Sequence, residues 1–448
     1  MRIFLSFLCI FIITVTAYGQ KKLSLNEAVR IALQRNTTLQ KAINSLKGSE
    51  SNVKAAYGNF LPNISASGRW NWNRSENKGG SFNIAGFVIN TPSSVTDSRS
   101  FGAGANWSLD LFDGLSNFAT LAQNKKELKS AQLQLQNLKQ NIVFQTMSLY
   151  YTVVNDQQLV YVNEDNLKWN QRNLETVIER NKLGAVTKAD VYAAQVQEGN
   201  AQLGVITAKN NFETAKSNLL YYLGLNVLES YSFSDSLTTQ ELSLLKTNVT
   251  QEYQNISSLV AEALNNRSDY KSAMLDYQSA QDGITIARSG YFPTLSNNIS
   301  YSLNANRLQD LLNSKTYSIG LNLNIPIFSG FSVENRVELA EVNAMNKKVD
   351  LDDLQRQIKQ NIQKTFLDLQ AAEQGLQVSR NTVKSSDENL KTSQEKYSLG
   401  SGTLLDVLTA SYNYTNARTN FINAEFQYIV FHEQLQYYLG VLNYKKYE

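Results

Sequence analysis

The 448-residue sequence holds one cysteine, one histidine and four prolines. Zinc and iron sites are built largely from Cys and His, and nucleophilic catalysis usually employs a His base. The scarcity of both residues argues against a metal centre or a catalytic triad, so we expect no enzyme and no cofactor. His432 is interpreted as a helix-surface or packing residue, because no second His is present to complete a site.

Charge is also scarce. Lys and Arg number 42 against 39 Asp and Glu, which leaves a net charge of +3. Nucleic-acid binding needs a concentration of basic residues, and this small excess does not supply one. We therefore expect no nucleic-acid partner.

Long apolar runs are missing beyond the N-terminus. Residues 1–19 combine Arg2, a short apolar run and Ala17-Tyr18-Gly19, which is typical of a signal peptide. Cys9 lies inside this segment, so the mature chain has no cysteine for a disulfide. No later run approaches ~18 apolar residues, and any membrane insertion is therefore expected to be by strands.

Alternating apolar and polar residues predict two β-hairpins. The alternation covers 64–72 and, after a Gly-, Ser- and Asn-rich loop, 101–111. It returns at 295–303 and 317–327. Such strands are long enough to cross a bilayer, which takes ~9–11 tilted residues.

The same hairpins could instead pack on helices in a soluble protein, and the strand pattern alone leaves both readings open. Four strands cannot close a barrel, because the smallest known barrels have about eight. Insertion into lipid would thus require several chains. The strand aromatics are interpreted as an interfacial girdle or, alternatively, as ordinary strand packing; they are Trp70, Trp72, Trp107, Tyr301 and Tyr317.

Two long proline-free stretches predict long helices over residues 116–183 and 332–399. Apolar residues recur every three or four positions, and each helix would extend roughly 100 Å. Shorter helices are expected over 25–57 and 257–290.

Each long helix ends at a Leu-Gly pair followed by a return helix. Gly184 and Gly400 are expected in the left-handed conformation, and Thr187 and Thr403 as N-caps.

The chain contains an internal duplication. At an offset of 216, Tyr222-Leu223-Gly224 matches Tyr438-Leu439-Gly440. Upstream, Phe60-Leu61-Pro62 matches Tyr291-Phe292-Pro293 at an offset of 231. The extra residues in the first hairpin are expected at a loop tip, where insertions are tolerated.

These signals predict an α+β fold with a duplicated organisation. The expected segments are a signal peptide (1–19), a first repeat (20–225) with a β-hairpin over 63–111 and a long helical hairpin over 115–224, a mixed linker (226–255), a second repeat (256–440) with a β-hairpin over 294–328 and a helical hairpin over 331–439, and a C-terminal tail (441–448).

Together these features resemble the TolC-type outer-membrane efflux proteins over the whole mature chain. The most specific motif is Tyr397-Ser398-Leu399-Gly400-Ser401-Gly402-Thr403-Leu404-Leu405-Asp406-Val407-Leu408-Thr409-Ala410. The resemblance implies a homotrimer that forms a twelve-stranded barrel in the outer membrane of a Gram-negative bacterium, continued by a periplasmic α-helical barrel. It also implies passive conduction of small molecules or polypeptides in a tripartite efflux or type I secretion system. The implied partners are outer-membrane lipid, a periplasmic adaptor (membrane fusion protein) and an inner-membrane transporter.

The resemblance further implies a closed channel entrance. Asp406 matches a family aspartate that faces the lumen, while Thr409 stands where the family has a second acid. Tyr397 and Asp190 match a family contact that holds the entrance shut, and Gly402 replaces the family Arg. Three copies of Asp406 would attract cations and raise each other's pKa. The alternative role for Asp406 is helix N-capping.

The two helical turns are expected to dock the adaptor, through Leu183, Gly184, Ala185, Leu399, Gly400 and Ser401. The alternative is that these glycines only end helices. A structural or adhesive coiled-coil surface protein is the alternative function, which would account for the helices but not for the duplicated hairpins. The exported substrate is not encoded in any recognisable motif.

Overall fold

The computed structural model describes residues 21–233 and 255–447. The expected signal peptide and most of the 226–255 linker lie outside them. The described chain forms two compact units. Among the described residues, the helical unit comprises 21–40, 137–233, 255–267 and 358–447, and the sheet unit comprises Lys41–Gln136 and Ser268–Gln357. Within the described ranges, no helix is both long enough and apolar enough to cross a membrane.

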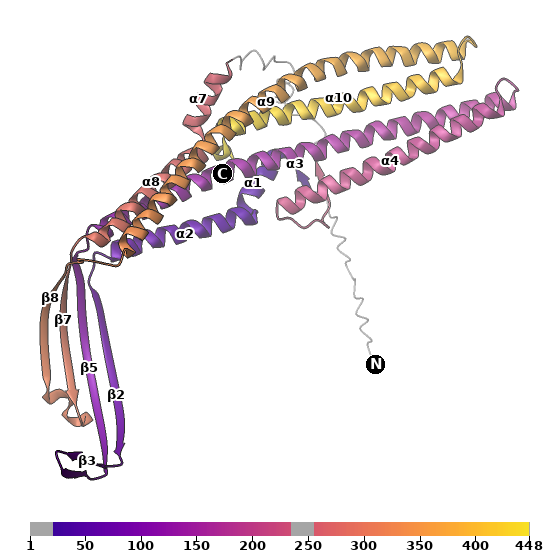
Figure 1. Cartoon of the computed structure of the whole chain (residues 1–448). Coiled ribbons are helices and arrows are strands. Elements are labelled where there is room, and N and C mark those ends of the chain that lie inside the picture. Colours follow the sequence, from indigo (N-terminus) through magenta and orange to yellow (C-terminus); the bar gives the residue numbers. More distant parts are fainter. Residues whose placement is uncertain (1–20, 234–254, 448) are drawn as a thin grey trace, which may run out of the picture. The chain divides into compact units, whose positions relative to one another are not determined.

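The sheet unit contains one antiparallel sheet in the order β2-β5-β7-β8. Pairing of β5 with β7 joins the two predicted hairpins, and Figure 1 shows the four strands side by side. This leaves β2 and β8 as the two edges of the sheet. The strands span Asn63–Asn77 (β2), Ser94–Phe112 (β5), Thr294–Ala305 (β7) and Lys315–Asn324 (β8).

The strand register confirms that the sheet has two different faces. Ile64 is paired with Trp107, and Trp107 with Ile299, so these three residues share one face. On the other face, Arg69 is paired with Gly102, and Gly102 with Asn304. One face is therefore mainly apolar and aromatic, and the other consists of Asn, Ser, Thr and Gly apart from Arg69 and Asp110.

The second hairpin is shorter than the alternation predicts. A short 3-10 turn, η1 (Ser289–Tyr291), precedes β7, and η2 (Leu308–Asn313) connects β7 with β8. β8 ends at Asn324, so the strand expected to reach residue 327 was predicted too long. Pro326 explains the early end, because it has no N–H to donate to a strand partner.

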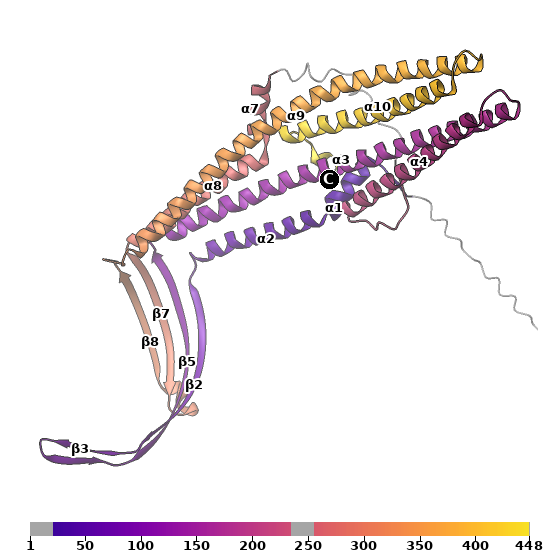
Figure 2. The same cartoon turned by 45° about the vertical axis from the view of Figure 1, so that its right-hand side comes forward.

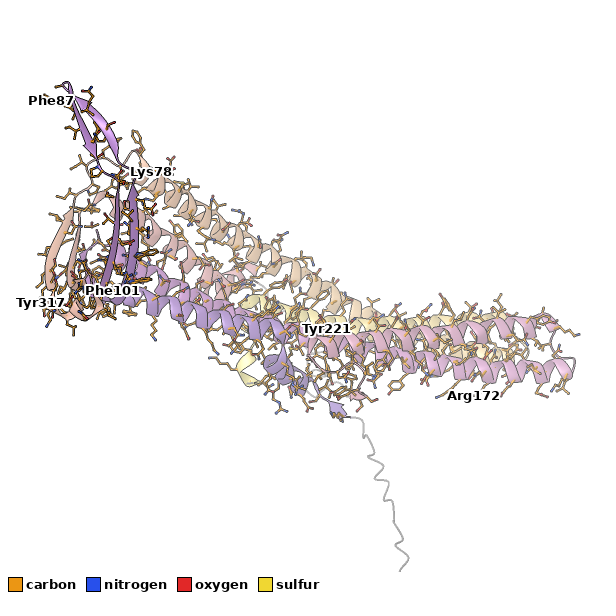
Figure 3. The ribbon with its side chains drawn as sticks, turned by 90° about the horizontal axis from the view of Figure 1, so that it is seen from below. Lys78, Phe87, Phe101, Arg172, Tyr221 and Tyr317 are labelled. Atoms are coloured by element: carbon orange, nitrogen blue, oxygen red, sulfur yellow. The ribbon has the colours of Figure 1, made fainter. Side chains whose placement is uncertain are left out.

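The β2–β5 hairpin ends in a further short hairpin, where a Gly-, Ser- and Asn-rich loop was expected. β3 (Gly80–Ile84) pairs with β4 (Phe87–Thr91). Ala85 and Gly86 between them have φ of 54° and 89°, as a two-residue hairpin turn requires. Figure 2 shows this hairpin bent away from the direction of β2 and β5. In Figure 3, Lys78 lies near the main strands and Phe87 lies at the tip of the hairpin.

The four longest helices of the described chain are α3, α4, α9 and α10, which are labelled in Figure 1. α3 (Ser116–Lys182) and α9 (Ser332–Ser398) each have 67 residues and run through both units. The return helices α4 (Lys188–Tyr222) and α10 (Leu404–Leu439) belong to the helical unit. There, Lys209 of α4 forms an ion pair with Glu164 of α3 at 2.8 Å. On another side of α3, Thr415 of α10 donates to Asn166 at 3.2 Å, so α3 contacts both α4 and α10.

The shorter helices are each broken in two, which the sequence did not predict. α1 (Leu25–Arg35) and α2 (Thr37–Gly58) meet at Asn36, and α7 (Ile256–Asn266) and α8 (Ser268–Arg288) meet at Arg267.

These two break residues are equivalent in the duplication. Asn36 donates through Nδ2 to the Tyr222 carbonyl at 3.4 Å, and Arg267 donates through Nη1 to the Tyr438 carbonyl at 3.1 Å. Each bond satisfies a carbonyl at the C-terminus of a return helix, which has no partner inside its own helix. The continuous helices expected over 25–57 and 257–290 were therefore wrong. Asn36 also caps α2 locally, since its Oδ1 accepts from the Thr38 and Leu39 N–H groups at 3.0 and 3.2 Å.

Two small elements complete the helical unit. β1 (Lys21–Leu23) pairs in parallel with β6 (Tyr231–Phe233), the only strand described within the predicted linker. The C-terminal tail packs against α3, where Gln140 donates to the carbonyls of Gly440 and Leu442 at 3.1 and 3.3 Å. The tail ends in η3 (Tyr444–Lys446).

Candidate functional site

The helical hairpins α3/α4 and α9/α10 reverse direction at the same end of the helical unit (Figure 1). Gly184 and Gly400 have φ of +73° and +74°, which confirms the left-handed conformation expected for both. A Cβ atom at either position would meet nothing within 4 Å, so the backbone conformation rather than crowding favours glycine. The N–H groups of Ala185 and Ser401 close the turns by donating to the carbonyls of Arg180 and Lys396, both at 2.9 Å.

Both return helices begin with the same capping box, which confirms Thr187 and Thr403 as N-caps. Asp190 accepts from the Thr187 backbone N–H at 2.9 Å and hydroxyl at 2.8 Å. Asp406 accepts from the Thr403 backbone N–H at 3.0 Å and hydroxyl at 2.7 Å. Each aspartate therefore has a local structural role.

The electrostatic surroundings of Asp406 within one chain differ from those implied by an acidic ring. The Thr403 side-chain and backbone hydrogen bonds hold the pKa of Asp406 below its ordinary value of 3.8, and Lys396 adds a weaker effect of the same sign. These contacts oppose the raised pKa that like charges would cause. The carboxylate is consequently ionised at neutral pH and exposed to solvent.

The outer surfaces of the turns are open. Leu183 and Leu399 are 84% and 82% exposed, although both are large apolar residues. Ala185, Ser401 and Thr409 are also exposed. Burying such a pair of leucines against a partner would be favourable by about 1.5–3 kcal/mol for each side chain.

A small apolar cluster lies behind the turns and joins the two helical hairpins. We call it the turn cluster. Its buried members are Val177 of α3, Ala194 of α4, and Leu404 and Leu408 of α10, with Trp169, Leu174, Val186, Val191 and Tyr397 packed around them. All four long helices thus contribute a side chain, so the two turns cannot separate without exposing this cluster.

Tyr397 makes a different contact from the one expected. Its ring lies 4.7 Å from the guanidinium carbon of Arg180, while its hydroxyl is buried and has no hydrogen-bond partner among the described residues. Asp190, the expected partner, is engaged by Thr187. Within one chain, the expected contact between Tyr397 and Asp190 is therefore absent. Tyr397 instead contacts Arg180 through its ring.

Gly402 has a steric reason for its identity. A Cβ atom there would lie 3.0 Å from the Cβ of Lys396 and 3.2 Å from the backbone nitrogen of Tyr397. The Gly402 N–H also donates to the Lys396 carbonyl at 3.1 Å. An Arg side chain at this position would require the turn to shift.

Sequence reasoning missed Arg180 and the turn cluster. The available signal for Arg180 was weak, because a basic residue in the last turn of a helix usually serves only to complement the helix dipole. The contact becomes evident only when α3 and α9 are brought together.

The five predicted girdle aromatics share the apolar face of the sheet according to the strand register. Trp70 and Trp72 are 61% and 55% exposed, and Tyr317 is 75% exposed. Tyr301 and Tyr317 are paired across strands, with ring centroids 4.9 Å apart. Figure 3 shows Phe101 and Tyr317 on the strands of this sheet.

A protein-family model described as outer membrane efflux protein matches the chain over residues 28–225 and 259–441. The chain is 25% identical to outer membrane protein TolC of Salmonella enteritidis, with 74% of this chain and 67% of that protein covered. It is 24% identical to outer membrane protein TolC of Vibrio cholerae serotype O1, with 95% of this chain and 90% of that protein covered.

Among solved structures, the fold is similar to the CmeC outer membrane channel of Campylobacter jejuni. The TM-score is 0.78 at 19% identity, and the alignment covers 94% of this chain and 88% of CmeC. At this level of identity the similarity concerns the fold.

Proposed function

The chain belongs to the outer membrane efflux protein family, and from this premise we propose that it is the outer-membrane channel of a tripartite efflux or type I secretion system. The protein resides in the outer membrane of a Gram-negative bacterium and extends into the periplasm. The observation that carries the proposal is the two-faced sheet, which combines an apolar, aromatic face for lipid with a polar face for a water-filled lumen. The family is one of efflux channels rather than enzymes.

We infer that three copies assemble. A single chain leaves the backbone groups of β2 and β8 unpaired at the edges of its sheet, and such edges are not tolerated in lipid. Three chains supply twelve strands, which exceeds the minimum of about eight for a closed barrel. The aromatic residues Trp70, Trp72, Trp107, Tyr301 and Tyr317 would then form the interfacial girdle.

The periplasmic partners are assigned to the helical turns. The exposed Leu183 and Leu399, with Ala185 and Ser401 beside them, would dock an adaptor that links the channel to an energised inner-membrane transporter. Conduction through the channel itself would be passive. The alternative of a coiled-coil surface protein has no support among the relatives described above.

The channel entrance is proposed at the same end of the helices. Asp406 would face the channel axis in addition to capping α10, with Thr409 following one helical turn later. The contact of Tyr397 with Arg180 and the turn cluster would hold the entrance closed.

Conductance of the purified protein tests this function. Protein extracted from outer membranes should produce discrete current steps in planar bilayers, and a sample dissociated by heat should produce none. Absence of any channel activity from an intact, folded assembly would contradict the proposed function.

A further inference from the structure

The polar face of the sheet is almost free of charge. Counted along the strand register within the described residues, it carries one basic residue, Arg69 near the middle of β2, and one acidic residue, Asp110 near the end of β5. The other residues on this face are Asn, Ser, Thr and Gly. An isolated positive charge on an otherwise neutral surface sets the sign of the local electrostatic potential, because no neighbouring charge offsets it.

The Arg69 side chain is exposed and hydrogen-bonded across the sheet. Its Nη2 donates to Asn304 Oδ1 at 3.0 Å, which spans from β2 across β5 to β7. The three residues Arg69, Gly102 and Asn304 form one row of the register. The guanidinium therefore lies at the level of this row.

Gly102 makes this position possible. A Cβ atom at residue 102 would lie 2.7 Å from Nε and 3.0 Å from Cγ of Arg69, and 3.2 Å from Asn304 Oδ1. Because Gly102 has no side chain, the Arg69 side chain can lie over β5 and reach Asn304 on β7. One of the five guanidinium N–H donors serves Asn304, and the side chain as a whole remains exposed to the polar side.

We propose that Arg69 is an anion-recognition residue of the strand-lined part of the channel and that its three copies favour solutes with carboxylate, phosphate or sulfate groups. The inference rests on the proposed function, because a ring of three guanidinium groups exists only in the trimer. A planar guanidinium with free donors pairs with such anions in two-point geometry. Its effect is opposite in sign to that of the Asp406 carboxylates at the helical end.

Salt dependence distinguishes this electrostatic effect from a steric one. The Debye length is about 30 Å at about 0.01 M salt and about 3 Å at about 1 M. A ring of charges on the wall of a wide pore therefore acts across the lumen at low salt and only at the wall at high salt.

The test is the reversal potential of trimers in planar bilayers under a KCl gradient. Arg69→Gln should lower the chloride-to-potassium permeability ratio by about twofold near 0.01 M, and the difference should vanish near 1 M. Arg69→Lys keeps the charge and should retain the ratio of the unmodified channel. Arg99→Gln is the matched control, because Arg99 pairs with Trp72 on the opposite face of the same sheet, and it should leave the ratio unchanged.

The outcomes separate this inference from the proposed function. Channels that open normally but show the same low-salt ratio after Arg69→Gln would overturn the role of Arg69 alone. An equal change with Arg99→Gln would also overturn it, because the effect would then not depend on the polar face. Complete absence of conductance in the unmodified protein would contradict both proposals.

Discussion

The guanidinium carbon of Arg180 lies 4.7 Å from the centre of the Tyr397 ring, joining α3 to α9 immediately behind the two helical turns. The Tyr397 hydroxyl takes no part, since it is buried without a hydrogen-bond partner among the described residues. The attraction is therefore between a cation and the face of an aromatic ring. It connects the two repeats at the proposed entrance.

Replacing Arg180 with Gln should favour opening of the entrance. A cation–π contact at a partly exposed site contributes about 0.5–1 kcal/mol, so the opening equilibrium should rise about two- to fivefold if each chain acts independently. The measurement is the open probability of single channels in planar bilayers. Arg172, an exposed residue on the same helix (Figure 3), provides the control through Arg172→Gln, which should not change the open probability.

Two variants of Tyr397 separate the ring from the hydroxyl. Tyr397→Phe keeps the ring and should open no more often than the unmodified channel. Tyr397→Leu removes the ring from both Arg180 and the turn cluster, so it should open at least as often as Arg180→Gln. A large effect of Tyr397→Phe would instead support a hydroxyl contact with an acid of a neighbouring copy.

Asp406→Asn should lower the cation preference of the channel. Asp190→Asn is a closely matched control, because it removes the same carboxylate from the equivalent capping box in the first repeat. If Asp406 only caps α10, both variants should weaken their helices comparably, by about 0.5–2 kcal/mol, and neither should change selectivity. Reversal potentials under a salt gradient decide between the two roles.

The pH dependence of this cation preference follows from the lowered pKa of Asp406. Within one chain, the Thr403 hydrogen bonds stabilise the ionised form and hold the pKa of Asp406 below its ordinary value of 3.8. The associated stabilisation is present above that value and is lost as the pH falls through the lowered pKa. Thr403→Ala removes the side-chain donor and should move the loss of cation preference to higher pH; an unchanged pH profile would mean that another group sets the preference.

Bulky substitutions at the turns should block adaptor docking without preventing assembly. Ala185→Trp and Ser401→Trp place a large side chain beside the exposed leucines, where the single chain leaves open surface. Crosslinking to the adaptor and transport in cells should both fall, while an inserted trimer persists. Normal crosslinking and transport in the double variant would rule out docking at these turns.

Removal of the β3–β4 hairpin should leave the trimer intact. Asn77 pairs with Ser94, so deletion of residues 79–92, with Lys78→Asn and Ser93→Gly, leaves a two-residue turn of the type that suits hairpins. Deleting only residues 79–85 would be a poorer test, because it removes β3 and leaves the apolar residues of β4 unpaired. The readout is the mobility of an unheated sample on a gel, and a shift to monomer would show that the hairpin holds the copies together.

The sequence predicted features whose signals are local. Alternation located the strands, and the Leu-Gly pairs located both turns. The β3–β4 hairpin also had a local signal, since Ala85-Gly86 separates an alternating segment (80–84) from a short apolar one (87–89), but its Gly- and Asn-rich surroundings favoured a loop. The break at Asn36 also had a local signal that was missed, because Asn36 Oδ1 accepts from the Thr38 and Leu39 N–H groups as an N-cap of α2. The break at Arg267 had no comparable signal, because its side chain bonds to a carbonyl of a distant return helix. The contact of Arg180 with Tyr397 likewise exists only after two helical hairpins have packed together.

The central claim is that this chain forms a trimeric channel in the outer membrane. Its most direct test is native mass spectrometry of the protein extracted by detergent from purified outer membranes. The expected result is a species with three times the mass of the mature chain, recovered from the outer-membrane fraction. Recovery of a monomer from the soluble periplasmic fraction would contradict the account.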